Sequence, residues 1–170
     1  MIKQIELTEF YIASEVICKS FITVAKEFEI TEQNCPKYVG FITTAKRLQA
    51  HHSRGWQIFG FYENERLVGC VLLSKSNENE NTYELHNLAV LPEYRHKNYG
   101  RQLLDYCITS VVKSGGNRVK ISIIEENNVL KNWYTAFGFV HTGIKKFEHL
   151  PFTSGYMELE VSLWESKLEF

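Results

Sequence analysis

A turn rich in basic residues separates a strand-like apolar run from a helical apolar pattern. The run Leu88–Leu91 leads in, and the turn itself reads "RHKNYG", from Arg95 to Gly100. The first N–H groups of a helix lack partners within the helix, and the helix dipole adds partial positive charge there. Asn98 and Gly100 tolerate backbone angles that let a chain approach a phosphate closely. Cations at this end cost helix stability, which a bound polyanion would offset. Spacing alone leaves a phosphate site and a solvated basic turn both open.

The elements that would position this turn alternate between strand and helix patterns. Residues 9–28 predict one broken helix or two short ones. Further helices are expected at 43–52, 99–113 and 128–137, and strands at 3–7, 56–62, 66–74, 83–91, 118–124, 139–149 and 155–163. This order predicts a mixed α/β (α+β) fold around one sheet.

Composition excludes several classes of protein. The 170 residues, 44% of them hydrophobic, are typical of a globular chain with its own core. A formal net charge of −1 argues against nucleic-acid binding and against attachment to a membrane surface. The four cysteines lack metal-ligand spacing, so we expect free thiols and no metal site. No signal peptide and no apolar run near the ~20 residues of a membrane span are evident, so a cytoplasmic location is expected.

Two motifs resemble those of the GNAT superfamily, the acetyl-CoA-dependent N-acetyltransferases. The stretch "LAVLPEYRHKNYGRQLL" is similar to the family's strand followed by R/Q-x-x-G-x-G/A, with Arg95, Asn98 and Gly100 at the three defined positions. The stretch "NNVLKNWYTAFGF", from Asn127 to Phe139, resembles a second segment, an Asn before a short helix that ends in Tyr-x-x-x-Gly-Phe. The resemblance implies one N-acetyltransferase domain over residues 1–170. Its sheet would be mixed and mostly antiparallel, flanked by helices, with acetyl-CoA bound at a splayed strand pair.

The resemblance also assigns the residues that would bind acetyl-CoA. The pantetheine arm would lie along the strand residues Leu88, Ala89 and Val90. The pyrophosphate would be bound by the loop amides of Arg95, His96, Lys97, Asn98, Tyr99, Gly100 and Arg101. Asn127 would contact the cofactor from the end of the next strand. Asn98 departs from the family's usual Gly. Asn is the best non-Gly residue at positive φ, so we expect a left-handed residue there and weakened cofactor binding relative to Gly.

Candidate catalytic residues follow from strand alternation and from the second motif. Alternation places Glu84 and His86 on one face of the strand that leads to the turn. A His of ordinary pKa ~6.5 suits a general base near neutral pH, with Glu84 as the second candidate and a base acting through water as the third. By resemblance, Tyr134 would protonate the departing CoA thiolate. The alternative interpretations are a hydrogen-bonded sheet histidine and a core aromatic.

The leading hypothesis is an acyltransferase that moves an acetyl group from acetyl-CoA to a primary amine on a small molecule or peptide. One alternative is a non-catalytic GNAT-like module that binds CoA as a sensor or scaffold. A general nucleotide-binding protein would need a Walker or Rossmann pattern, and neither occurs. The adjacent His51 and His52 are expected only to end a helix. The acceptor amine is left open, and the resemblance also allows a homodimer.

Overall fold

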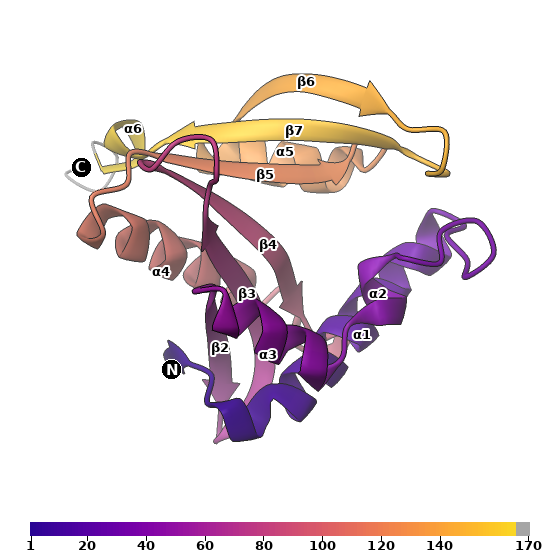
Figure 1. Cartoon of the computed structure of the whole chain (residues 1–170), viewed down its shortest axis with the longest axis horizontal. Helices are drawn as coiled ribbons and strands as arrows, with labels where there is room; N and C mark the ends of the chain where they lie inside the picture. Colours follow the sequence, from indigo (N-terminus) through magenta and orange to yellow (C-terminus); the bar gives the residue numbers. More distant parts are fainter. Residues whose placement is uncertain (166–170) are drawn as a thin grey trace. The chain divides into compact units, whose positions relative to one another are not determined.

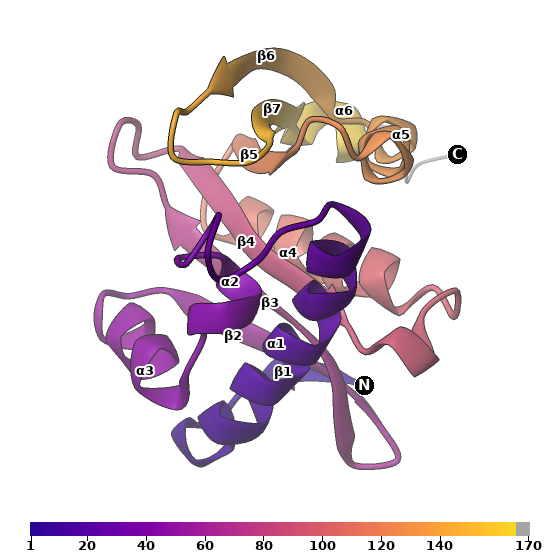
Figure 2. The ribbon, with the colours of Figure 1, turned by 90° about the vertical axis from the view of Figure 1, so that its right-hand side faces the viewer.

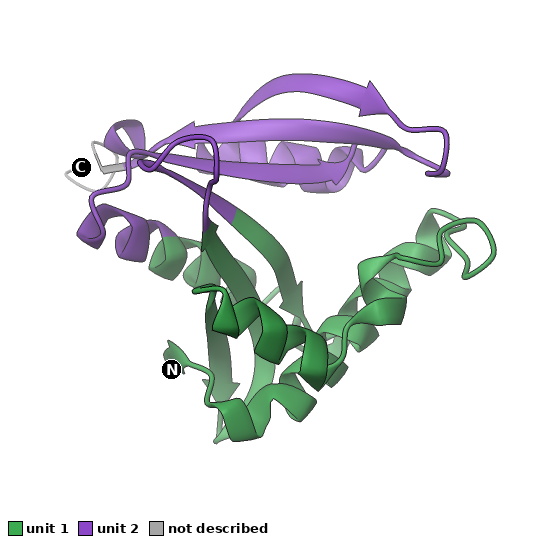
Figure 3. Ribbon diagram, in the orientation of Figure 1, with its two compact units in different colours: residues 1–74, 85–107 green, residues 75–84, 108–170 purple. Residues whose placement is uncertain are grey.

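The computed structural model describes residues 1–165 and divides them into two compact units. Unit 1 contains residues 1–74 and 85–107, and unit 2 contains residues 75–84 and 108 onwards (Figure 3). The strand β4 (Thr82–Val90) and the helix α4 (Tyr99–Lys113) run through both units. The single domain predicted for 1–170 remains our proposal, and its last five residues lie outside the described part.

Seven strands form one mixed, mostly antiparallel sheet in the order β1-β2-β3-β4-β5-β7-β6. Antiparallel pairs join β1 to β2, β2 to β3, β5 to β7 and β6 to β7, and β4 pairs with β5 in parallel. The remaining strands are β1 (Ile2–Gln4), β2 (Gln57–Glu63), β3 (Arg66–Lys75), β5 (Arg118–Ile124), β6 (Val140–Lys146) and β7 (Thr153–Glu160). The predicted fold class is therefore confirmed.

In unit 1 the first long helix is continuous. The short 3-10 turn η1 (Leu7–Glu9) leads into α1 (Phe10–Glu27), so the predicted break was wrong. Its buried residues recur at helical spacing, which explains the predicted helix. The hydroxyls of Ser14 and Thr23 donate to carbonyls three residues earlier, so they are satisfied within the helix without interrupting it.

A short helix that the sequence did not predict follows. α2 (Val39–Ile42) lies beside α1, as Figures 1 and 2 show. A Cβ on Gly40 would lie 3.2 Å from the Cβ of Phe21, so a glycine permits this close approach. Next comes α3 (Ala45–Ser53), close to its predicted bounds. Its cap, Thr44, accepts a hydrogen bond from the backbone N–H of Arg47 at 3.2 Å.

The β2–β3 hairpin and β4 frame the rest of unit 1. Asn64 and Glu65 both have positive φ, as a two-residue hairpin turn requires, which confirms the turn predicted at "ENE". The 3-10 turn η2 (Pro92–Tyr94) then ends β4. Within β4, Asn87 has φ of 52°, a kink that the sequence analysis missed. Regular alternation therefore does not continue from His86 to Leu88.

Unit 2 places α5 (Asn128–Phe137) alongside β5, β7 and β6 (Figures 1 and 2). The helix ends at Gly138, whose φ of 128° suits glycine. The predicted last strand was too long, because β7 ends at Glu160 and α6 (Val161–Glu165) follows it. Val161 and Trp164 of that helix are buried. Within residues 1–165, no helix is long and apolar enough to cross a membrane.

Candidate active site

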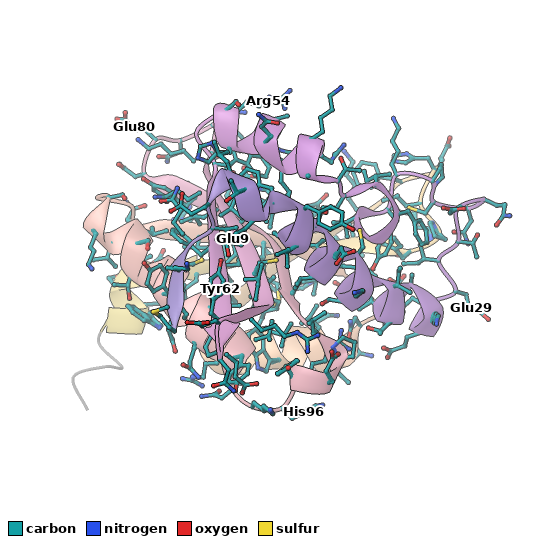
Figure 4. The ribbon with its side chains drawn as sticks, turned by 90° about the horizontal axis from the view of Figure 1, so that it is seen from below. Glu9, Glu29, Arg54, Tyr62, Glu80 and His96 are labelled. Carbon is teal, nitrogen blue, oxygen red and sulfur yellow. The ribbon has the colours of Figure 1, made fainter. Side chains whose placement is uncertain are left out.

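The loop from Arg95 to Gly100, here named the 95–100 loop, has two left-handed residues. Asn98 has φ of 66°, which confirms the predicted backbone, and His96 has φ of 62°, which was not foreseen. The Asn98 carbonyl accepts the first helical hydrogen bond from Gln102, at 3.1 Å. His96 is exposed and points away from the strands (Figure 4). Left-handed residues in a tight turn arrange successive N–H groups into a concavity suited to anions.

The Arg95 side chain is anchored, so the charge it brings to the turn is not mobile. Its guanidinium donates to the carbonyls of Val90 and Ser20, at 3.2 and 2.9 Å, and to the Thr23 hydroxyl at 2.9 Å. Burial lowers the pKa of this guanidinium from its usual value, although an arginine in a protein stays charged. Arg95 therefore ties the 95–100 loop to α1.

The β2–β3 hairpin holds the loop from the other side. Lys97 Nζ lies 3.6 Å from a carboxylate oxygen of Glu63 and 4.9 Å from the centre of the Tyr94 ring. The Tyr99 hydroxyl donates to the same carboxylate, and the Tyr99 ring stacks on Phe61 with centroids 4.1 Å apart. The loop is thus preorganised by its side chains, which leaves its backbone amides as the groups suited to a phosphate.

His86 of β4 lies in a stack of three rings. The Trp56 ring stacks on His86 at 4.4 Å and on His51 at 4.1 Å, measured between centroids. His86 Nε2 lies 2.9 Å from the hydroxyl oxygen of Ser74, a buried residue of β3. Burial, and next the charge of His51, lower the pKa of His86 to about 4. This differs from the expected ordinary value, because the rings exclude water from the imidazole.

The same side chains form one wall of a pocket in unit 1, here named the α3 pocket. Its volume is about 190 Å³. His86 and the kinked Asn87 line it from β4, and its other described lining residues are Lys37, Val39, Ile42, Thr43, Arg47, Leu48, His51 and Trp56. Two consecutive β4 residues can face one pocket because the Asn87 kink breaks the strand's alternation.

Unit 2 holds three of the other predicted residues, which are Tyr134, Asn127 and Glu84, whereas Leu88, Ala89, Val90 and Arg101 belong to unit 1. Tyr134 is 5% exposed, and its ring packs edge-on against Trp133 and Phe139. Asn127 caps α5, because its side-chain oxygen accepts the Leu130 N–H at 3.1 Å. Glu84 is half-buried and pairs in register with Lys120 of β5. Unit 1 thus brings His86 together with the α3 pocket and also contains the 95–100 loop, whereas Tyr134, Asn127 and Glu84 belong to unit 2.

Five members of this arrangement were missed by sequence reasoning. Each looks ordinary alone. Ser74 is a serine in a buried strand, Trp56 stands at the start of a strand and His51 stands near the end of a helix. The other two are the exposed cations Lys37 and Arg47. The adjacent histidines were a usable signal, but not a specific one. Within the described part, no group of three or more His, Cys, Asp or Glu side chains could hold a metal ion.

Comparison with known proteins agrees with the fold. The ribosomal-protein-S18-alanine N-acetyltransferase of Escherichia coli has a TM-score of 0.75 at 17% identity, over 95% of this chain and 93% of that one. The PaiA N-acetyltransferase of Thermoplasma acidophilum, solved with coenzyme A, has a TM-score of 0.79 at 19% identity, over 94% and 98%. A putative acetyltransferase of Salmonella typhimurium, solved with acetyl-CoA, has a TM-score of 0.69 at 17% identity, over 95% and 93%.

Sequence comparison identifies the family. An uncharacterized N-acetyltransferase of Schizosaccharomyces pombe is 29% identical over 80 residues, which are 46% of this chain and 55% of that protein. The match therefore spans about half the length of that curated relative. The acetyltransferase (GNAT) family matches residues 23–139, which is more than half of the chain. The chain belongs to the GNAT family of acetyltransferases.

Proposed function

We propose that this protein transfers the acetyl group of acetyl-CoA to a primary amine. The observation that carries the proposal is the 95–100 loop, with two left-handed residues at the start of α4 and anchored basic side chains. Such a loop offers its amides to a pyrophosphate. The pantetheine arm would lie beside Leu88–Val90, and Asn127 would contact the cofactor with its amide N–H groups, since its side-chain oxygen caps α5.

The reaction requires two proton transfers. The amine nitrogen attacks the thioester carbon, the C–S bond breaks, and the new amide nitrogen must lose a proton while the thiolate gains one. We assign the first transfer to His86 and the second to Tyr134, with Glu84 or water as the alternative base. Tyr134 offers modest help, because a thiolate is already a fair leaving group.

The low pKa of His86 bears on whether it accepts a proton before or after the amine attacks the thioester. Moving a proton from an amine of pKa ~10.4 to an imidazole of pKa about 4 costs about 9 kcal/mol, whereas release to water at pH 7 costs about 5 kcal/mol. His86 is therefore too weak to deprotonate the incoming ammonium. The amine arrives neutral, and His86 accepts its proton after attack, when the nitrogen has become acidic. Ser74, 2.9 Å from Nε2, orients the imidazole for this step.

Thermal unfolding with acetyl-CoA tests the cofactor assignment, with ATP and NAD as controls. At a hundredfold excess over Kd, binding should raise the melting temperature by about 5–11 °C, and the controls should not. Thiol release from acetyl-CoA in the presence of an amine panel then tests the transfer. Binding without thiol release for any amine would favour a non-catalytic CoA-binding module.

Tyr134→Phe tests the acid assignment. Its kcat should fall about tenfold or more while the Kd for acetyl-CoA stays within twofold, because only the hydroxyl is removed and the ring still packs on its neighbours. Steady-state thiol release gives kcat, and titration calorimetry gives the Kd for acetyl-CoA. An unchanged kcat would remove Tyr134 from the mechanism.

A further inference from the structure

The α3 pocket is lined by charges of one sign. Ten described residues line it, and among them Lys37 and Arg47 are the cations while none is Asp or Glu. Lys37 lies between α1 and α2, and Arg47 lies in the first turn of α3. Two separate segments thus bring positive charge to one pocket. Because the pKa of both lining histidines is lowered, their rings add no full charge at neutral pH.

The position of Arg47 is unfavourable for its helix. The first turn of α3 contains Lys46 and Arg47 and no acidic residue. Cations at a helix N-terminus oppose the dipole. A bound anion would be attracted by the helix dipole and by both pocket cations, so it would offset the repulsion between the dipole and the cations. The pocket, and not the helix end alone, is what selects the position of such an anion.

The remaining walls limit the size and chemistry of an occupant. Val39, Ile42 and Leu48 supply apolar surface, and the ring stack closes the side where His86 lies. Its volume of about 190 Å³ is comparable to that of an apolar cavity of ~150 Å³ that binds benzene. The pocket therefore suits a small molecule with an apolar part, or one residue of a chain.

We propose that the acceptor is an amine that also carries a carboxylate, such as a free amino acid, and that Lys37 and Arg47 bind this carboxylate. This inference rests on the proposed function, because it places the acceptor beside His86. Polyamines and aminoglycosides are disfavoured as acceptors, since each brings several positive charges to two cations with no acidic partner among the described lining residues. The carboxylate fixes the orientation of the acceptor, and the apolar walls contact its body.

Matched acceptor pairs test the class. Thiol release from acetyl-CoA is measured with phenylalanine against phenethylamine and with lysine against cadaverine, so that each pair differs by one carboxylate. Within a pair the amino carboxylate should have the lower KM. The two amines of a pair differ in reactivity and therefore also in kcat. The KM of each variant is therefore compared with the KM of the wild-type protein for the same substrate.

Three methionine variants remove a charge and keep the length of the side chain. Lys37→Met and Arg47→Met should each raise the KM for the amino carboxylate about tenfold, which is the loss of one exposed charge-assisted contact. Neither should change the KM for acetyl-CoA or for the decarboxylated amine. Lys46→Met is the matched control, because Lys46 is exposed, stands next to Arg47 and does not line the pocket.

Calorimetric titration with acetylphenylalanine, which has a carboxylate and no reactive amine, separates the two hypotheses. Carboxylate binding that Arg47→Met abolishes, without thiol release from any amine, would keep the carboxylate site and overturn the acetyl transfer. Thiol release with equal or better KM for phenethylamine and cadaverine would overturn the carboxylate site alone. If no acetylphenylalanine binds and no thiol is released, both proposals fail.

Discussion

The 95–100 loop and the α3 pocket lie in the same unit, but they are built in different ways. The loop consists of consecutive residues, and its backbone has local features that a sequence can reveal: an ending strand, two left-handed residues and a helix start. Contacts to α1 and to the β2–β3 hairpin then hold that backbone in place. The pocket is assembled from residues 37–56 and from two residues of β4. A local motif identifies the first region in the sequence, whereas only tertiary structure brings the second together.

The difference also separates what the two regions can contribute. The Arg95 and Lys97 side chains of the loop are engaged with protein groups, so its anion site consists mainly of backbone amides and varies little with side-chain identity. The α3 pocket is formed by side chains, and its charge and shape depend on each of them. Cofactor binding should therefore tolerate substitutions in the loop that keep its backbone, while acceptor choice should respond to single changes in the pocket.

The largest expected effect comes from His86→Gln. Because Gln is not titratable at neutral pH, kcat should fall ~10²–10⁴-fold, the usual contribution of a positioned proton acceptor. The Kd for acetyl-CoA should change little. Presteady-state thiol release measures the chemical step directly. Full activity in this variant would remove His86 from the reaction and leave Glu84 or water as the base.

Ser74→Ala is the companion change, because it removes the 2.9 Å hydrogen-bond partner and keeps the imidazole. A smaller loss than for His86→Gln is expected, in kcat and not in the KM for acetyl-CoA. Ser74→Thr, which keeps a hydroxyl, should recover part of it. Equal losses in Ser74→Ala and Ser74→Thr would indicate a packing defect in β3 instead of a positioning role.

The pH dependence of stability gives the next largest effect. His86 has a pKa of about 4 in the folded chain and about 6.5 when unfolded, so between these values the unfolded chain alone binds the proton. The stability that the neutral, buried His86 allows is fully present above pH 6.5, and it is lost as the pH falls towards 4 because protonation then favours the unfolded chain. The advantage of wild type over His86→Gln in the free energy of unfolding should shrink by about 3 kcal/mol over this range.

Urea unfolding at intervals between pH 7 and pH 4 measures this difference, in which the other titrating groups largely cancel. His51 also has a pKa lowered by burial and belongs to the same stack. Adding His51→Gln to His86→Gln should therefore make the free energy of unfolding depend still less on pH. A pH-independent difference between wild type and His86→Gln would mean that water reaches the imidazole, and the timing argued for its proton transfer would lose its basis.

Arg95→Met should have a moderate effect, because it removes two hydrogen bonds that hold the 95–100 loop on α1 and a third to the Val90 carbonyl of β4. Losing these charge-assisted bonds should lower the free energy of unfolding by about 2 kcal/mol and weaken acetyl-CoA binding in parallel. Thr23→Val removes only one of those acceptors and serves as the control. Unchanged cofactor affinity in Arg95→Met would show that the loop needs no anchor.

Sequence reasoning succeeded where the information is local. The helices from Tyr99 and Asn128, the turn at Asn64 and the left-handed Asn98 follow from apolar periodicity and from residue-specific backbone preferences. It failed where the outcome depends on distant partners. No local pattern reveals that Arg95 bonds to α1 or that Trp56 shields an imidazole from water. The family resemblance carried the cofactor residues, and nothing in it singled out Lys37 or Arg47.

The smallest expected effect is that of Asn98→Gly. Asn98 already has φ of 66°, so the loop is folded in the conformation that a glycine would permit. Gly removes some left-handed strain but adds freedom to the unfolded chain, and these terms of about 0.5–1 kcal/mol oppose each other. Stability should therefore stay within about 0.5 kcal/mol of wild type, while acetyl-CoA affinity rises only a few-fold, through removal of a side chain near the pyrophosphate.

His96→Gly distinguishes the two causes, because His96 has φ of 62° in the same loop. If backbone freedom limits cofactor binding, both glycine variants should raise the affinity for acetyl-CoA to a similar degree. If crowding by the Asn98 side chain limits it, only Asn98→Gly should do so, and Asn98→Ala should raise the affinity while lowering stability, because alanine tolerates positive φ poorly. Calorimetric titration of the three variants decides between these causes. A weaker affinity in Asn98→Gly would mean instead that the Asn98 amide itself binds the cofactor, and side-chain identity would then matter in the loop as it does in the α3 pocket.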